Sequence, residues 1–313
     1  MATSKPQQLN LFGAVAIGLA SMLGAGVFFV WSTAWDKSHS NIFYALLLAA
    51  LVAGLNSASV YQLASNVSRS GGVYAYARNY LPPVFSFVAG FSFVFGKIAS
   101  IAAIAIIIQT YLLPGYHLAT AVVILMTLLN LLGINRTALM AAVLAISTTS
   151  FLLFSVGSGF ASGISLSSFD SQFLIPDLSL NTLSSASIIF FAFAGYARVA
   201  TLGDEVKDPK RNIPRAIVIS LSLVLLIYFL ITFVLVGVLN PSNETMPSAV
   251  FEALLSRTAS WFPAWLIDVV VVGASLGSIL ALLAGVSRTA ATMAEDSELP
   301  KLFAKRNRFG APW

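Results

Sequence analysis

Eight long apolar blocks constrain the fold of this chain more than any other feature of its sequence. Each block approaches the length of about 20 residues that a helix needs to cross the hydrocarbon core of a bilayer. The expected spans are 11–34, 41–65, 83–109, 118–134, 138–160, 183–203, 213–239 and 264–289. Because only helices and closed barrels satisfy every backbone group in lipid, apolar blocks of this length predict an all-α membrane protein.

Composition supports lipid as the main solvent. Charged residues make up 9% of the chain and apolar residues 58%, whereas soluble domains carry about 25% charged residues. The formal net charge of +5 comes from basic residues in short loops between the blocks. No run of Lys and Arg interleaved with aromatics suggests a nucleic-acid surface. Membrane lipids are therefore expected partners, and nucleic acid is not.

The sequence offers no set of residues for catalysis or metal binding. It contains no cysteine, which excludes disulfides, thiolate chemistry and cysteine-based metal sites. The two histidines, His39 and His117, are isolated in predicted loops, so no metal site is expected. No phosphate-binding glycine-rich loop with Gly-Lys-Ser/Thr is present, and no paired aspartates or Ser-His arrangement suggests intramembrane proteolysis. We expect a protein that is not an enzyme and needs no cofactor.

The distribution of basic residues predicts the orientation in the membrane. With the N-terminus in the cytoplasm, the outer segments hold only Lys37 and Arg257. The inner segments hold Lys5, Arg69, Arg78, Arg136, Lys207, Lys210, Arg211, Arg215, Arg288, Lys301, Lys305, Arg306 and Arg308. Short cytoplasmic loops carry the excess of Lys and Arg in membrane proteins. The sequence therefore predicts a multi-pass protein of the cell membrane with both termini cytoplasmic, forming one domain over residues 1–313.

Two of the spans contain glycines near mid-membrane. The first span carries Gly24 and Gly26, and the sixth carries Gly195. Glycine weakens a helix, and backbone groups freed at a break must line a cavity or meet a ligand. Packing through small residues is the alternative for Gly24 and Gly26 taken alone. Because spans one and six are five apart, as an inverted five-helix repeat requires, we favour a transporter binding site.

The two breaks suit one class of substrate. A half-helix that begins at a break offers free N–H groups and a positive dipole end, which bind a carboxylate. The carbonyls freed where the other half-helix ends attract an ammonium group. A zwitterionic amino acid therefore fits such a site without any charged side chain, and amino acid transport is the predicted function.

Several short motifs follow one another over nearly the whole chain. They are Met-Leu-Gly-Ala-Gly-Val-Phe at 22–28, Ser-Gly-Gly-Val-Tyr-Ala-Tyr-Ala-Arg at 70–78, Phe-Phe-Ala-Phe-Ala-Gly at 190–195 with the loop 203–217, Ser-Arg at 287–288, Glu-Leu-Pro-Lys at 298–301 and Gly-Ala-Pro-Trp at 310–313. This ordered set resembles the amino acid–polyamine–organocation transporters. The resemblance implies a LeuT-like fold of two inverted five-helix repeats, and transport by alternating access.

The resemblance also implies a substrate site at the two breaks, with Phe191 as an aromatic gate over the substrate. Together with Lys97, the candidate substrate-binding residues are Met22, Gly24, Ala25, Gly26, Lys97, Phe191, Ala194 and Gly195. The candidate gating or vestibule residues are Phe193, Tyr196 and Arg198.

The chain departs from the family pattern in three ways. Members usually have about twelve helices, and this sequence stops where the ninth should start, so we expect a fragment or a shortened protein. The first repeat is expected over about 11–160, a partial second repeat over about 183–289, and a cytoplasmic tail over 290–313. Ala197 stands where an acidic residue often follows the helix-six glycine, and span five has no lysine. The coupling ion is therefore open, with a proton as one alternative.

Two basic residues are expected inside the membrane. Lys97 lies midway along the third span, about 15–20 Å from either end, which is farther than its stem reaches. An ammonium at that depth needs a cavity, a partner or neutralisation. We hypothesise that Lys97 faces the site, where it attracts a carboxylate or titrates during transport; a structural lysine with a carbonyl or acidic partner is the alternative. Arg198 is expected to line the inner vestibule or to pair with Asp204 or Glu205.

Lys97 and Ala197 argue against dicationic substrates and favour neutral amino acids. A truncated, non-transporting membrane protein or a partner subunit is the alternative from another class. A channel is a third interpretation, which the clustering of polar residues at two helix breaks disfavours. The sequence does not determine the oligomeric state.

Overall fold

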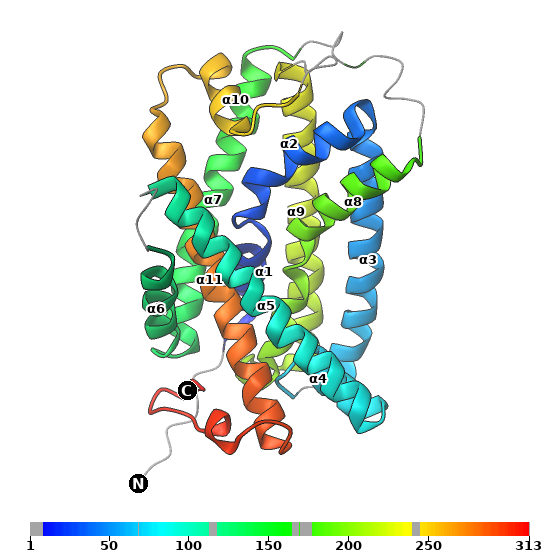
Figure 1. Cartoon of the computed structure of the whole chain (residues 1–313), viewed down its shortest axis with the longest axis vertical. Helices are drawn as coiled ribbons and strands as arrows, with labels where there is room; N and C mark the ends of the chain where they lie inside the picture. Colours follow the sequence, from blue (N-terminus) through cyan, green and yellow to red (C-terminus); the bar gives the residue numbers. More distant parts are fainter. Residues whose placement is uncertain are drawn as a thin grey trace.

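A computed structural model of the chain describes residues 9–67, 69–112, 118–164, 169, 177–239 and 245–312, without the side chains of residues 110–112 and 204. The described residues form helices α1 (Leu11–Met22), α2 (Gly26–Ser38), α3 (Ile42–Asn66), α4 (Val73–Tyr80), α5 (Pro83–Leu112), α6 (Leu118–Asn130), α7 (Ile134–Ala161), α8 (Leu180–Phe193), α9 (Pro209–Leu239), α10 (Val250–Thr258) and α11 (Ala264–Glu295). Three 3-10 segments, η1 (His39–Asn41), η4 (Tyr196–Glu205) and η5 (Lys301–Ala304), join or extend them. Helices α3, α7 and α9 run along the long axis, and α5 crosses one face obliquely (Figure 1).

The helices agree with the spans expected from the sequence. By length and composition, the stretches able to cross a membrane are Gly26–Asn66, Pro83–Gln109, Ile134–Ala161, Leu180–Gly203, Pro209–Leu239 and Ala264–Glu295. The shorter apolar helices α1 and α6 supply the rest. Each of the eight predicted spans coincides with one helix or with one broken pair, because the first span is α1 with α2 and the sixth is α8 with η4. The predicted all-α membrane fold is confirmed.

Several helix ends differ from the predicted limits. Helix α9 begins at Pro209, four residues before the predicted start at 213, and α11 continues to Glu295 instead of ending at 289. Proline suits the first helical position, where no intrahelical N–H bond is needed. The carbonyl of Asp208 also accepts the N–H groups of Arg211 at 3.0 Å and Asn212 at 2.9 Å. Polar residues thus extend this helix beyond the apolar block.

The apolar side chains divide between a packed interior and the outer surface. The largest buried cluster joins α1, α2, α3, α7, α8 and α9, with Trp31 fully buried among them. On α5 the rings of Phe87, Phe91 and Phe95 form an exposed row, with neighbouring centroids 5.7 and 4.1 Å apart. Exposed apolar area on this scale marks a surface that contacts lipid or protein.

A few residues named in the sequence analysis lie outside the described part of the chain. They are Lys5, His117, Trp313 and the side chain of Asp204. The other histidine, His39, lies in η1, and its ring is 6.1 Å from that of Trp35.

Candidate substrate cavity

Helix α1 ends in the middle of the molecule, and α2 continues after a three-residue break. The N–H of Leu23 bonds the carbonyl of Leu19 at 2.7 Å and closes α1. At the start of α2, the N–H groups of Val27 and Phe28 bond the carbonyls of Gly24 and Ala25 in the break at 3.3 and 3.1 Å, whereas the N–H of Gly26, its first residue, has no carbonyl to bond within that half-helix. Gly24 lets the break lie directly against α11, because a Cβ there would be 1.6 Å from Oγ of Ser278.

The sixth span is interrupted in the same region. Helix α8 ends at Phe193 and η4 begins at Tyr196. A Cβ at Gly195 would lie 2.5 Å from the carbonyl carbon and oxygen of Ser21, so only glycine allows this approach. The hydroxyl of Ser21 donates to the Gly195 carbonyl at 3.0 Å. The two breaks are therefore in direct contact.

Buried hydroxyl groups satisfy carbonyls that the breaks leave free. Tyr228 on α9 donates to the carbonyl of Met22 at 2.7 Å and lies 3.3 Å from that of Ala192, so one hydroxyl bridges both broken helices. Ser278 on α11 donates to the carbonyl of Ala20 at 3.1 Å. These contacts join residues far apart in sequence, and the sequence analysis missed both hydroxyls.

A cavity lies where the two breaks meet α5 and α11. It contains about 410 Å³ of atom-free space, part of which is continuous with solvent. The lining residues are Ser21, Met22, Gly24, Gly26, Lys97, Ser100, Ile104, Phe191, Ala192, Ala194, Gly195, Arg198, Ser278 and Leu282. The structure thus brings together the predicted substrate-binding residues with the exception of Ala25, and it adds Arg198 from the predicted vestibule.

Three predicted residues do not line this cavity. Ala25 is buried in a cluster with Ile101 and Ile104 of α5. Phe193 is fully buried, and its ring centroid lies 4.8 Å from that of Tyr228. Tyr196 is also buried, at the start of η4. Successive residues of a helix point about 100° apart, so neighbours of lining residues face the packed interior instead.

Ser100 and Ile104 are lining residues that helical spacing could have identified. They follow Lys97 by three and seven residues on α5, which places all three on one face of the helix. Ser278 and Leu282 come from α11, and no local pattern in the sequence ties that helix to the breaks.

Both cations at the cavity lack an acidic partner among the described residues. Lys97 is in none of the ion pairs there. Arg198 is 4% exposed, and its Nη1 has no hydrogen-bond partner. Of the two acids named as alternative partners of Arg198, Glu205 is wrong, because its carboxylate accepts a hydrogen bond from Nε of the buried Arg288 on α11, and the side chain of Asp204 lies outside the described residues. Glu205 lies seven residues beyond Arg198 and points to a different helix.

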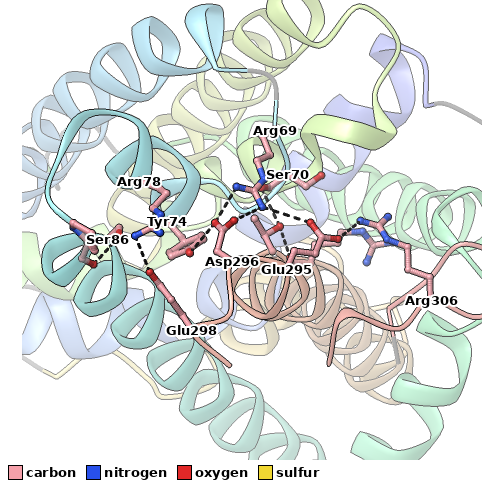
Figure 2. Close-up of polar contacts among 12 residues, drawn as sticks. Arg69, Ser70, Tyr74, Arg78, Ser86, Glu295, Asp296, Glu298 and Arg306 are labelled. Carbon is pink, nitrogen blue, oxygen red and sulfur yellow. Dashed lines mark hydrogen bonds and ion pairs between the residues drawn. The ribbon is translucent and has the colours of Figure 1, made fainter. Parts of the chain in front are cut away.

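A second polar cluster lies at the end of α11 (Figure 2). We call Arg69, Tyr74, Arg78, Asp296 and Glu298 the Arg69 cluster. Arg69 donates two hydrogen bonds to Asp296, both 2.9 Å, and the Tyr74 hydroxyl adds a third at 2.9 Å. Arg78 donates to Glu298 at 3.1 Å. Burial raises the pKa of Asp296, but the hydrogen bonds from Arg69 and Tyr74 outweigh it, so this pKa lies below its usual value.

The glycines of the 70–78 motif shape the turn that leads into α4. Gly71 and Gly72 have φ of 113° and 54°, which favour glycine. A Cβ at Gly72 would also lie 2.9 Å from Cγ2 of Thr201 in η4. The hydroxyl of Thr292 on α11 donates to the carbonyl of Ser70 at 3.1 Å. This motif therefore docks the α3–α4 turn on both η4 and α11.

Comparison with known proteins identifies the family. The amino acid permease family matches residues 13–313. The chain belongs to this family of transporters. It is 39% identical to an uncharacterized transporter of Mycobacterium tuberculosis, over 98% of this chain and 70% of the relative. It is 22% identical to the branched-chain amino acid permease BcaP of Bacillus subtilis, over 96% of this chain and 70% of the relative.

The fold comparison agrees with the family assignment. A Na⁺-coupled sialic acid symporter, solved in a substrate-bound outward-open state, superposes with a TM-score of 0.63 at 16% identity, covering 97% of this chain and 68% of the symporter chain. The resemblance to the amino acid–polyamine–organocation transporters and the LeuT-like arrangement are both confirmed. The protein is a multi-pass membrane transporter and not an enzyme.

Proposed function

We propose that this permease carries amino acids across the cell membrane by alternating access, with the substrate bound in the central cavity. One observation carries the proposal: the two broken helices meet at a single cavity, and residues at both breaks line it. Irregular backbone at membrane depth is characteristic of transporter binding sites.

Each end of a zwitterionic substrate has a complementary group at the breaks. The positive end of α2, which begins at Gly26, attracts the carboxylate. The negative end of α8, which closes at Phe193, attracts the ammonium group. Phe191 is 57% exposed and lines the cavity, which supports its role as the gate that covers the substrate.

The names of the relatives indicate chemically different substrates. The relatives' names include the branched-chain permease above, a methylthioribose transporter of Bacillus subtilis at 24% identity, and cationic amino acid transporters of Arabidopsis thaliana at 24% identity. Such variety within one family means that specificity depends on the side chains around the breaks. The sequence, through Lys97 and Ala197, favours neutral over dicationic substrates.

Counterflow tests the proposal. The purified chain is reconstituted into proteoliposomes preloaded with one unlabelled amino acid, and entry of labelled amino acids is followed. Saturable uptake that requires internal substrate is expected. Uptake without saturation would indicate a channel. No exchange by protein that is folded by circular dichroism and thermal melting would contradict the transport proposal and favour a non-transporting role.

The proposed topology has both termini in the cytoplasm, a first repeat over about 11–160, a partial second repeat over about 183–289 and a tail over 290–313. The chain has no cysteine, so single cysteines report position directly. Ser256→Cys in α10 is expected to react with an impermeant maleimide from outside intact cells, and Lys301→Cys only after permeabilisation. The reverse pattern would overturn the orientation.

A further inference from the structure

Among the residues that the structure describes, the central cavity is lined by two basic side chains and no acidic one. The two are Lys97 and Arg198. Neither cation has an ion pair among the described residues. Arg198 is almost fully buried, yet its Nη1 has no hydrogen-bond partner there. A buried guanidinium with an unused donor at a cavity wall needs a hydrogen-bond acceptor, and a bound anion would supply both the acceptor and the counter-charge.

Lys97 and Arg198 reach the cavity from different elements, α5 and η4. Lys97 shares its face of α5 with Ser100 and Ile104, which also line the cavity. The stem of Arg198 lies against α11 at Gly285, where a Cβ would be 2.9 Å from Cδ of the arginine. Gly285 thus makes room for a side chain that follows directly after the helix-six break. The arginine is a built component of the wall, not a mobile surface group.

Among the described side chains, which do not include that of Asp204, no acid forms an ion pair with Lys97 or Arg198. Glu205, seven residues beyond Arg198, is bound by Arg288. Asp296 and Glu298 belong to the Arg69 cluster at the end of α11. Charges within membrane segments are stabilised by partners or ligands, and they mark substrate pathways. The counter-charge for the cavity is therefore expected from the substrate.

A neutral amino acid does not supply that charge. The charges of its carboxylate and its ammonium group cancel. The end of α2 is already complementary to the carboxylate, and the end of α8 to the ammonium group. An acidic amino acid carries an additional carboxylate, which binds arginine through two parallel hydrogen bonds and lysine through one.

We propose that the cavity binds an amino acid with an acidic side chain, glutamate or aspartate, whose side-chain carboxylate lies between Arg198 and Lys97. This inference rests on the proposed function and refines its substrate class. It replaces the sequence-based preference for neutral substrates, because the sequence did not place Arg198 at the same cavity as Lys97. The α-carboxylate and α-ammonium keep their places at the helix ends.

Equilibrium binding to the purified chain tests the assignment with four probes: tritiated L-glutamate, L-aspartate, L-glutamine and L-leucine. Glutamate or aspartate is expected to bind at least about tenfold more tightly than glutamine, which has nearly the same shape without the charge. Arg198→Gln and Lys97→Gln are each expected to weaken binding of the acidic amino acid by about 30-fold or more and to change glutamine binding by less than about threefold. Arg198→Lys, which retains the charge, is expected to lose less than Arg198→Gln.

Arg215→Gln is the matched control, because Arg215 is exposed near the start of α9 and does not line the cavity.

Melting of the ligand-free variants provides an independent measurement. Removing an unpaired buried cation is expected to raise the melting temperature of Arg198→Gln above that of the unmodified chain, and glutamate is expected to stabilise the unmodified chain but not this variant. A lower melting temperature without ligand would mean that Arg198 has a structural partner, and would overturn the proposal.

The outcomes separate the two proposals. Equal or tighter binding of glutamine or leucine, or an equal loss for all probes in the variants, overturns the acidic-substrate assignment and leaves amino acid transport intact. Binding of none of the probes, together with no counterflow of any amino acid by folded protein, overturns both.

Discussion

Replacing Gly24 by alanine tests the contact between the first helix break and α11. The new Cβ would lie 1.6 Å from Oγ and 2.6 Å from Cβ of Ser278, with the Ala274 carbonyl next at 3.3 Å. Rotation of the Ser278 side chain moves its hydroxyl away but leaves its Cβ too close to the new Cβ at residue 24, so α11 or the break in the first span must shift. Overpacking of this kind costs about 1–3 kcal/mol.

Rotation of Ser278 has a second consequence. Its hydroxyl donates to the carbonyl of Ala20 at 3.1 Å, and losing a partner from a buried carbonyl costs about 1–3 kcal/mol. Gly24→Ala is therefore expected to destabilise the protein by about 2–6 kcal/mol. That corresponds to a fall in melting temperature of roughly 4–24 °C. Counterflow at a temperature where the variant is folded is expected to fall as well, because the break borders the cavity.

Intrinsic tryptophan fluorescence during heating in detergent measures the shift, and Gly54→Ala is the control. Gly54 lies within α3, and a Cβ there would meet no atom within 4 Å, so alanine is expected to be neutral or to stabilise by up to about 1 kcal/mol. In the Ser278→Gly background, Gly24→Ala is expected to cost less than about 1 kcal/mol, since the opposing side chain is gone. An equal cost of Gly24→Ala with and without Ser278 would refute the steric argument.

Three further predictions follow from the hydrogen bonds and turns. Tyr228→Phe removes the hydroxyl that bridges the two breaks; we expect about 1–3 kcal/mol of lost stability and slower counterflow, and an unchanged melting temperature would contradict the bridge. Asp296→Asn at neutral pH is expected to lower the free energy of unfolding by about 1–2 kcal/mol. Water around the partly exposed Arg69 weakens this ion pair and keeps the loss small. The folded pKa of Asp296 lies below the ordinary value of 3.8, so the stability that its carboxylate contributes is present above pH 3.8 and is lost as the pH falls through the folded pKa. Between pH 7 and pH 3, the melting temperature of Asp296→Asn is therefore expected to fall less than that of the unmodified chain. Identical curves of melting temperature against pH would refute the assignment. Gly72→Ala combines a positive φ with a contact at 2.9 Å, and we expect its melting temperature to fall, whereas that of Gly54→Ala stays unchanged or rises; an unchanged melting temperature for Gly72→Ala would contradict this reasoning.

The sequence alone predicted the features that depend on local composition. Apolar block length predicts a membrane-spanning helix, because each such helix satisfies its own backbone in lipid. The breaks at Gly24 and Gly195 could be predicted because glycine lowers helix stability wherever it stands. The ordered motifs then indicated the family, and the comparison confirmed it.

Tertiary structure decided which side chains meet at the breaks. Tyr228 and Ser278 reach carbonyls more than 200 residues away along the chain, and no local pattern indicates such partners. Ala25 and Phe193 stand beside lining residues but face the packed interior. Glu205 pairs with Arg288 rather than Arg198. Contacts of this kind depend on the packing of α9 and α11 against the breaks, so only the assembled bundle shows that both cations at the cavity lack an acidic partner within the described part of the chain.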